Sequence, residues 1–130
     1  MSGEHATDDG KTVLIVEDDE EVARVLARLL ETTGLRVLTA PEPKDAIALG
    51  SDPEVKIDLI VLDIMLPGMS GFTVAEKMSS LRPGIGILYV SGTVILPQDK
   101  PHPGLSGVVR FLAKPVEADV FRATAHEMLA

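Results

Sequence analysis

Residues 57–71 of the chain read IDLIVLDIMLPGMSG, and this stretch decides the fold. Ile57 to Leu62 is an apolar run rich in β-branched residues, with one acid at Asp58. A run of this length, followed by a loop with Pro and Gly, is typical of a strand buried on both faces, as in parallel sheets covered by helices. The run ends at Asp63, at the sheet edge where ligands bind in open α/β folds. We therefore predict a parallel α/β sheet in which Asp63 is placed for chemistry.

Outward from this stretch, short apolar runs alternate with amphipathic stretches. We predict the other strands at 12–16, 35–39, 85–90 and 108–113. We predict helices from Glu20 to just before Gly34 and over 42–50, 72–81 and 117–129, with inner faces formed by Val22, Val25, Leu26, Leu29 and Leu30, by Phe72, Ala75 and Met78, and by Val120, Phe121, Thr124 and Met128. The prolines and glycines of 93–107 predict a short or irregular crossover. The whole pattern predicts a doubly wound, flavodoxin-like (βα)5 fold with a five-stranded parallel sheet of order 2-1-3-4-5.

The composition is that of one globular domain and narrows the function classes. We assign residues 12–130 to this domain and residues 1–11 to a disordered N-terminal lead-in. The net charge of −8 argues against nucleic acid and anionic membranes as partners. The chain has no cysteine, which excludes disulfides and thiolate nucleophiles. Because the sequence holds no stretch as long as a membrane span and no signal peptide, we expect a cytoplasmic protein.

Every informative polar residue follows a predicted strand at its carboxyl end. Glu17 and Asp18 follow the first strand, Asp63 the third, Ser91 the fourth and Lys114 the fifth. In the order 2-1-3-4-5 the first and third strands are neighbours, so the three carboxylates should meet. Crowded carboxylates repel one another unless a cation lies between them, and Mg²⁺ prefers oxygen ligands. The sequence therefore predicts a magnesium site beside Asp63.

The same residues suit the transfer of a phosphoryl group. A carboxylate such as Asp63 can attack phosphorus and form an acyl phosphate. Lys114 offers a positive charge and Ser91 a hydroxyl donor to the phosphoryl oxygens. Taken singly, each residue has a plain structural explanation, such as a helix cap, a surface lysine or a turn serine. Their common placement at strand ends favours a functional site.

Four stretches carry these residues: VLIVEDD (13–19), DLIVLDIMLPGMSG (58–71), LYVSG (88–92) and FLAKP (111–115). With them the chain resembles the bacterial response-regulator receiver domain of two-component systems, the CheY-like family. The resemblance runs from about Thr12 to Leu129, nearly the whole fold. It implies the receiver fold and a phosphoprotein of phosphorelay signal transduction that carries an aspartyl phosphate.

The resemblance implies roles around the phosphoacceptor. Asp63 would accept the phosphoryl group, and it would bind Mg²⁺ together with Asp18 and the backbone carbonyl of Met65. Glu17 would contribute to the metal site through water. Many relatives have Asp at the position of Glu17, and Glu is a common variant there. Met65 and Thr93 occupy positions that tune dephosphorylation in the family.

The resemblance also implies how the switch would work. Lys114 would pair with the phosphoryl group, and Ser91 would move to hydrogen-bond it. Phe111 would then turn inward as the switch residue, although it lacks a hydroxyl with which to signal. Pro115 would follow Lys114 in a cis peptide.

The implied partners are a sensor histidine kinase or a histidine phosphotransfer protein upstream, and a protein target or a linked output domain downstream. The output would be a change of the surface near strands four and five. The Pro-rich stretch 97–104 lies where the family has its fourth helix, on a usual output or dimer face, so a homodimer stays open. The protein would be a switch with slow self-hydrolysis rather than a turnover enzyme. The start at Met1 favours a single-domain regulator or an N-terminal receiver over another fragment of a longer protein.

Two alternatives belong to other classes. A haloacid-dehalogenase-like phosphatase or phosphotransferase would carry a second acid two residues after the nucleophile, where this chain has Met65. A degenerate receiver would act as a protein-binding scaffold without phosphorylation. The presence of all the expected site residues counts against it.

Overall fold

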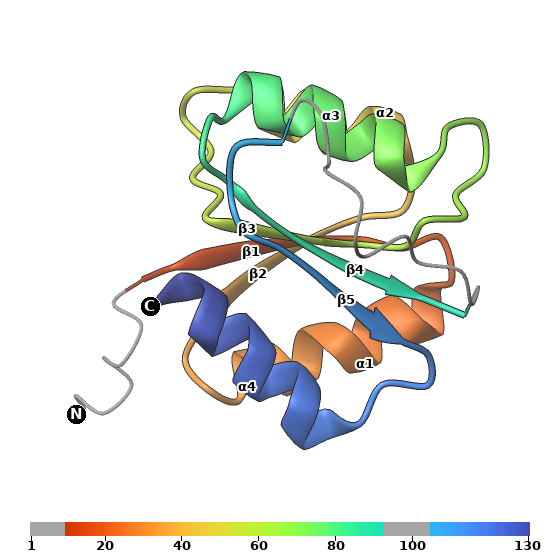
Figure 1. Ribbon diagram of the computed structural model, residues 1–130, viewed down its shortest axis with the longest axis vertical. Helices are drawn as coiled ribbons and strands as arrows, with labels where there is room; N and C mark the ends of the chain where they lie inside the picture. Colours follow the sequence, from red (N-terminus) through yellow and green to blue (C-terminus); the bar gives the residue numbers. More distant parts are fainter. Residues whose placement is uncertain (1–9, 93–104) are drawn as a thin grey trace.

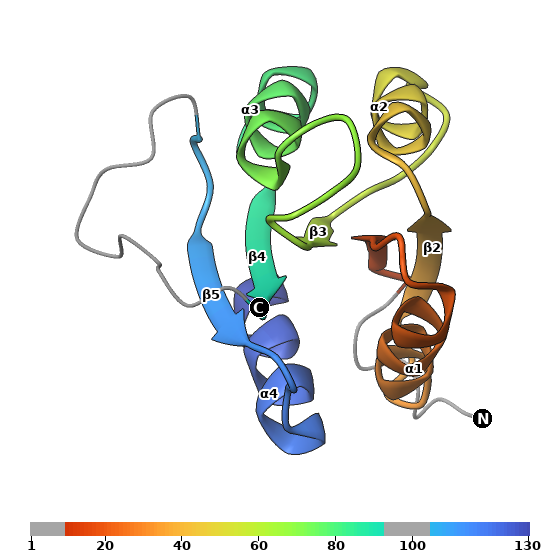
Figure 2. The ribbon, with the colours of Figure 1, turned by 90° about the vertical axis from the view of Figure 1, so that its right-hand side faces the viewer.

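The computed structural model describes residues 10–92 and 105–130. Its elements, in chain order, are β1 (Thr12–Val16), α1 (Glu20–Glu31), β2 (Arg36–Ala40), α2 (Pro43–Ser51), β3 (Leu59–Leu62), α3 (Gly71–Leu81), β4 (Gly86–Ser91), β5 (Val109–Ala113) and α4 (Ala118–Leu129). The strands form one parallel sheet in the order β2-β1-β3-β4-β5, which confirms the predicted fold class. Figures 1 and 2 show α2 and α3 on one face of the sheet and α1 and α4 on the other.

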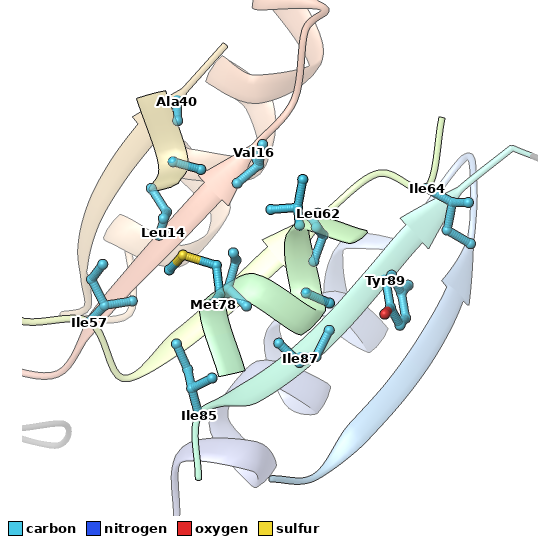
Figure 3. Packing of buried hydrophobic residues seen from close by; sticks show 14 residues of the cluster. Leu14, Val16, Ala40, Ile57, Leu62, Ile64, Met78, Ile85, Ile87 and Tyr89 are labelled. Atoms are coloured by element: carbon cyan, nitrogen blue, oxygen red, sulfur yellow. The ribbon is translucent and has the colours of Figure 1, made fainter. Parts of the chain in front are cut away.

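Alternate side chains of the strands enter two separate cores. In β1, Leu14 and Val16 belong to the cluster under α2 and α3, whereas Val13 and Ile15 belong to the cluster under α1 and α4. Figure 3 shows the first cluster, with Met78 of α3 among the strand residues. Every residue of β1 and β3 is buried, as expected for central strands covered on both faces. Packing on both faces fixes β1 and β3 next to each other, so their carboxyl ends lie side by side.

Two polar side chains fix the ends of helices. The Oδ1 of Asp19 accepts hydrogen bonds from the amides of Glu21 (3.0 Å) and Val22 (3.2 Å), so Asp19 caps α1. Arg82, which follows α3, donates from Nε to the carbonyl of Gly50 (3.0 Å) and from Nη2 to that of Asp52 (2.8 Å). Its guanidinium therefore links the end of α3 to backbone carbonyls at the end of α2.

Two valines predicted on inner helix faces are on the surface, and this corrects the sequence analysis. Val25 is 55% exposed and Val120 is 43% exposed. In α1 the buried stripe is centred on Leu26, and Val25 lies about 100° around the helix from it. Val120 has the same offset from the buried Phe121 in α4. Both valines lie at the edge of the apolar face of their helix, and only the centre of that face packs against the sheet.

The predicted bounds differ from the observed ones by at most two residues, and one of the larger differences is the start of β3. This strand begins at Leu59 rather than Ile57. The preceding residue, Asp58, makes two hydrogen bonds to Thr12 at the start of β1. The Oδ2 of Asp58 accepts from the amide of Thr12, and the amide of Asp58 donates to the carbonyl of Thr12, both at 2.8 Å.

Two predictions fall largely outside the described residues. The disordered lead-in concerns residues 1–11, of which 1–9 are not described, and the irregular crossover concerns 93–107, of which 93–104 are not described. The end of that crossover is placed by Ser106, whose amide donates to the Oγ of Ser79 (3.2 Å) and whose Oγ accepts from the amide of Gly84 (2.8 Å). None of the helices in the described part is long and apolar enough to cross a membrane.

Candidate functional site

Three carboxylates gather where β1 and β3 end. The two strands are paired with Val16 opposite Leu62, so the residues that follow them, Glu17 and Asp63, leave the sheet side by side. Glu17, Asp18 and Asp63 each offer a carboxylate oxygen, and these oxygens all lie within 4.8 Å of one another. The structure thus brings together the three acids that the sequence placed at one edge. Their oxygens could hold a metal ion.

Lys114 joins two of the three acids. Its Nζ lies 2.7 Å from the Oε1 of Glu17 and 2.9 Å from the Oδ2 of Asp63. The backbone positions it, because the amide of Lys114 donates to the carbonyl of Ser91 at 2.9 Å. The Lys114–Pro115 peptide is cis, as the resemblance implied. One ammonium among three carboxylates leaves an excess of negative charge, and this favours a divalent cation with hard oxygen ligands.

Burial acts in opposite directions on the pKa values of Glu17 and Lys114. Burial raises the pKa of Glu17 above its ordinary value, and the hydrogen bonds from Lys114 and the amide of Asp19 only partly oppose it. Burial alone would lower the pKa of Lys114, but its hydrogen bonds to Glu17 and Asp63 and their charges outweigh burial and raise it. The difference follows from the neighbours: Lys114 faces two carboxylates, whereas Glu17 faces one ammonium group and the like charge of Asp63, which raises the pKa of Glu17 further.

The loop after β3 orients Asp63. The amide of Met65 donates to the Oδ1 of Asp63 at 3.0 Å, so both carboxylate oxygens have a donor. The loop then returns to the strand, with the amide of Gly71 donating to the carbonyl of Ile64 at 2.8 Å. A Cβ on Gly71 would clash with the backbone carbonyl oxygen of Asp63, so only glycine fits at this approach. Met65 itself is 66% exposed beside the carboxylate.

The acidic run after β1 separates into three roles. Glu17 points inward, and its Oε2 accepts from the amide of Asp19 at 3.1 Å. Asp18 is exposed and offers its carboxylate to the cluster. Asp19 uses its Oδ1 to cap α1. Both oxygens of Glu17 are thus hydrogen-bonded to the protein, while Asp18 faces solvent.

Ser91 and Phe111 lie on the strands next to the acids. Ser91 ends β4 and is buried, and Phe111 is half-buried in β5. The ring of Phe111 stacks on Tyr89 of β4, with centroids 5.0 Å apart and planes inclined by 21°. The movements expected of Ser91 and Phe111 stay predictions.

Sequence reasoning missed two features beside this site. Tyr89 was counted as part of a buried strand, and only its place two residues before Ser91 could have drawn attention to it. An apolar groove of about 460 Å³ also begins at Lys114 and includes the exposed Val25. Its lining is formed by Glu21, Val22, Val25, Leu26, Val90, Lys114, Pro115 and Val116.

Comparisons with known proteins agree with this geometry. The chain is 34% identical over 113 residues to the uncharacterized transcriptional regulatory protein YrkP of Bacillus subtilis, which covers 85% of this chain and 46% of that protein. It is 35% identical over 107 residues to the phosphate regulon transcriptional regulatory protein PhoB of Pseudomonas aeruginosa, covering 82% and 46%. It is 30% identical over 130 residues to the sensor kinase CckA of Brucella abortus, covering 97% and 13%. The chain thus spans less than half the length of these curated relatives.

Solved structures give the same picture. A CheY-like response regulator receiver domain protein from Methanospirillum hungatei superposes with a TM-score of 0.81 at 27% identity, covering 93% of this chain and 94% of the other. The receiver domain of the hybrid histidine kinase CckA gives a TM-score of 0.76 at 28% identity, covering 92% and 99%. The family model of the response regulator receiver domain matches residues 13–126. With its sheet order and its cluster of acids, the chain belongs to the response regulator receiver domain family.

Proposed function

We propose that this protein is a phosphoacceptor switch of a two-component phosphorelay. Asp63 takes a phosphoryl group from a phosphohistidine on a sensor histidine kinase or on a histidine phosphotransfer protein. The acyl phosphate on Asp63 then changes the surface near β4 and β5 and alters the binding of a downstream partner. The protein acts in the cytoplasm as a switch with slow self-hydrolysis, not as a turnover enzyme.

The arrangement of Lys114 is the observation that carries this proposal. Its Nζ contacts the Oδ2 of Asp63 at 2.9 Å, at a strand edge where Asp18 and Glu17 add negative charge. A carboxylate in contact with an ammonium group is suited to accept a phosphoryl group, because the ammonium then neutralises negative charge on the phosphoryl oxygens. The side chain of Asp63 is still 11% exposed, so a donor can reach it.

The acids suit Mg²⁺ as the cofactor. Asp18 and Asp63 supply direct carboxylate ligands, and the backbone carbonyl of Met65 supplies a third protein oxygen. Glu17 acts through water, which agrees with the hydrogen bonds that both its oxygens already accept from the protein. When bound, Mg²⁺ neutralises charge on the transferring phosphoryl group.

The transfer itself exchanges one bond to phosphorus for another. An oxygen of Asp63 forms the new P–O bond while the P–N bond to the donor imidazole breaks. The electron pair of that bond stays on the imidazole, which takes up a proton from solvent. Lys114 keeps its contact with the anionic phosphoryl group. In the conformational change that follows, the hydroxyl of Ser91 donates a hydrogen bond to a phosphoryl oxygen.

Relatives support the choice of partners. One is named as a sensor kinase and others as transcriptional regulatory proteins, each longer than this chain. A receiver of this family therefore occurs in chains named for both ends of a phosphorelay. The scaffold alternative is weaker, because Lys114 and the three acids are all brought together.

The test is intact mass after incubation with Mg²⁺ and acetyl phosphate. We expect one phosphoryl adduct on the native chain, dependent on Mg²⁺. The matched control is Asp63→Asn, which keeps the size of the side chain and removes the nucleophilic carboxylate. Asp18→Asn is expected to form the adduct more slowly at the same Mg²⁺ concentration. A native chain that stays unmodified, or an adduct that persists in Asp63→Asn, would contradict the proposal.

A further inference from the structure

Tyr89 is the largest fully buried side chain next to the site, and its aromatic contacts extend in two directions. It is 1% exposed and stacks on Phe111 of β5, with centroids 5.0 Å apart. On the other side it meets the ring of Phe72 edge to face, with centroids 5.1 Å apart and planes inclined by 61°. Three rings thus link β5, β4 and the first turn of α3.

The sheet places Tyr89 and the two predicted switch residues on one face. Tyr89 pairs with Phe111 across the ladder, and Ser91 pairs with Ala113, so Ser91 and Phe111 are diagonal neighbours. Residues two apart on a strand share a face, so Tyr89 and Ser91 point the same way. Figure 3 shows Tyr89 on β4 with Ile87, in the cluster under α2 and α3. Because Tyr89 and Phe111 are paired across the ladder, a turn of Phe111 toward Ser91 changes the stacking of the two rings.

We infer that Tyr89 is a positioning residue of the switch: its ring holds Phe111 in the resting arrangement and links it to Phe72 at the start of α3. The inference rests on the proposed phosphoacceptor function. A stacked aromatic pair is a directional contact, so the near-parallel geometry favours the arrangement seen here over one in which Phe111 has turned. Tyr89 thereby slows phosphorylation, because the phosphorylated form requires Phe111 to leave the stack.

Phe72 makes the effect reach beyond β5. Its amide is bound by the Oγ of Ser70, the cap of α3, at 3.0 Å, and Ser70 ends the loop that begins at Asp63. Release of Phe111 loosens the contact that orients the ring of Tyr89, and Phe72 loses part of its support. The ring of Phe72 is therefore expected to respond to phosphorylation through its contact with Tyr89.

The first experiment measures the rate of adduct formation with acetyl phosphate and Mg²⁺. Tyr89→Leu removes the stack and is expected to react about two- to tenfold faster. Tyr89→Phe keeps both ring contacts and should react within about twofold of the native rate. Phe121→Leu is the matched control: it removes a fully buried ring from the other core, so it should lower stability without changing the rate. An unchanged or slower rate in a folded Tyr89→Leu overturns the inference.

A double-mutant cycle separates positioning from a general structural effect. If Tyr89 acts through Phe111, then Tyr89→Leu should have no further effect on the rate in a Phe111→Leu background. If Tyr89→Leu increased the rate by the same factor in the native and Phe111→Leu backgrounds, Tyr89 would act independently of Phe111 and the inference would be wrong.

A third test uses the native chain and needs no substitution. Tyr89 is the sole tyrosine, there is no tryptophan, and there are three phenylalanines. With Mg²⁺ and beryllofluoride, a phosphoryl mimic whose binding is followed by its fluorine resonance, we expect the fluorescence of Tyr89 and the ring resonances of Phe111 and Phe72 to change, while Phe121 stays constant. Bound mimic with Tyr89 and Phe72 unchanged overturns the inference and leaves the proposed function standing. Failure of the mimic to bind, together with absence of a phosphoryl adduct, overturns both.

Discussion

Lys114 shows how much a single side chain depends on the rest of the fold. Its Nζ contacts acids from the ends of β1 and β3, and its amide is held by the end of β4. Because the pKa of Lys114 is raised, its charge stabilises the folded state fully below its ordinary value of 10.5, and this contribution is lost as the pH rises through the folded-state pKa. The ammonium is therefore a stabilising group across the neutral range.

Replacement of Lys114 should destabilise the metal-free protein. Lys114→Met leaves the buried Glu17 facing Asp63 without a cation, so we expect the free energy of unfolding at pH 7 to fall by roughly 1–3 kcal/mol. Urea unfolding in the presence of a chelator measures this difference. Lys44→Met is the control, since the Lys44–Glu42 pair is solvent-exposed and should matter by less than about 0.5 kcal/mol. Equal stability of Lys114→Met and the native chain at pH 7 would show that the pair contributes nothing.

Tyr89 sets an alkaline limit to stability. Burial, and to a lesser degree the charge of Glu76, raises the pKa of its phenol above the ordinary value of 10.0. The unfolded chain therefore releases this proton first, and the native protein loses stability as the pH rises above 10.0. Tyr89→Phe should abolish this part of the loss, seen as a stability difference that changes in favour of the variant between pH 9 and pH 11. Parallel pH profiles of the two proteins would contradict the expectation.

At the scale of elements, the loop between β3 and α3 is the most constrained part of the site. The missing side chain of Gly71 lets the start of α3 lie against the carbonyl of Asp63. The neighbours of the absent Cβ are backbone atoms, which cannot turn aside as the tip of a flexible side chain can. The geometry of Asp63 is therefore tied to the position of α3.

A methyl group at this position should disturb both stability and phosphorylation. Gly71→Ala is expected to lower the free energy of unfolding by about 2–4 kcal/mol, because the backbone of the loop must shift to relieve the contact. Thermal and urea unfolding would measure the loss, and the rate of adduct formation should fall with it. Gly92→Ala is the matched control, since a Cβ there meets nothing within 4 Å. A Gly71→Ala protein as stable as this control would contradict the argument.

The sequence predicted the elements better than their faces. The strand order and the meeting of the acids followed from apolar runs that end in Asp63 or in Glu17, because parallel strands share one carboxyl edge. The exposure of Val25 and Val120 could not be predicted, since a helical stripe does not say which of its edges turns away from the sheet. Tyr89 was missed because a ring in an apolar strand has the same pattern as plain core.

At the scale of the whole molecule, the two cores support one charged edge. The acids leave that edge with more negative charge than Lys114 can balance, and this charge opposes folding when no metal ion is bound. A ligand that binds only the folded state stabilises it by mass action. Metal binding should therefore be visible in the stability of the entire chain.

Mg²⁺ should raise the midpoint of thermal unfolding by roughly 3–8 °C at about ten times its dissociation constant. Asp18→Asn should lose most of this shift. Asp19→Asn removes the same charge from the adjacent position, but Asn still caps α1 and Asp19 is outside the acid cluster, so its shift should resemble that of the native chain. Calorimetry of the three proteins with and without Mg²⁺ is the measurement. Equal shifts in both variants would mean that the cation binds elsewhere.

The strand order has a further consequence for synthesis on the ribosome. β1 emerges first, β2 and β3 can then add to its two sides, β4 to β3 and β5 to β4, so no strand must insert between two others. The face of β3 and β4 that carries Val61 and Leu88 is different, because it is covered by α4, which is made last among these elements. Until residues 118–129 have left the exit tunnel, this apolar face stays in water, and the nascent chain is an expected client of chaperones.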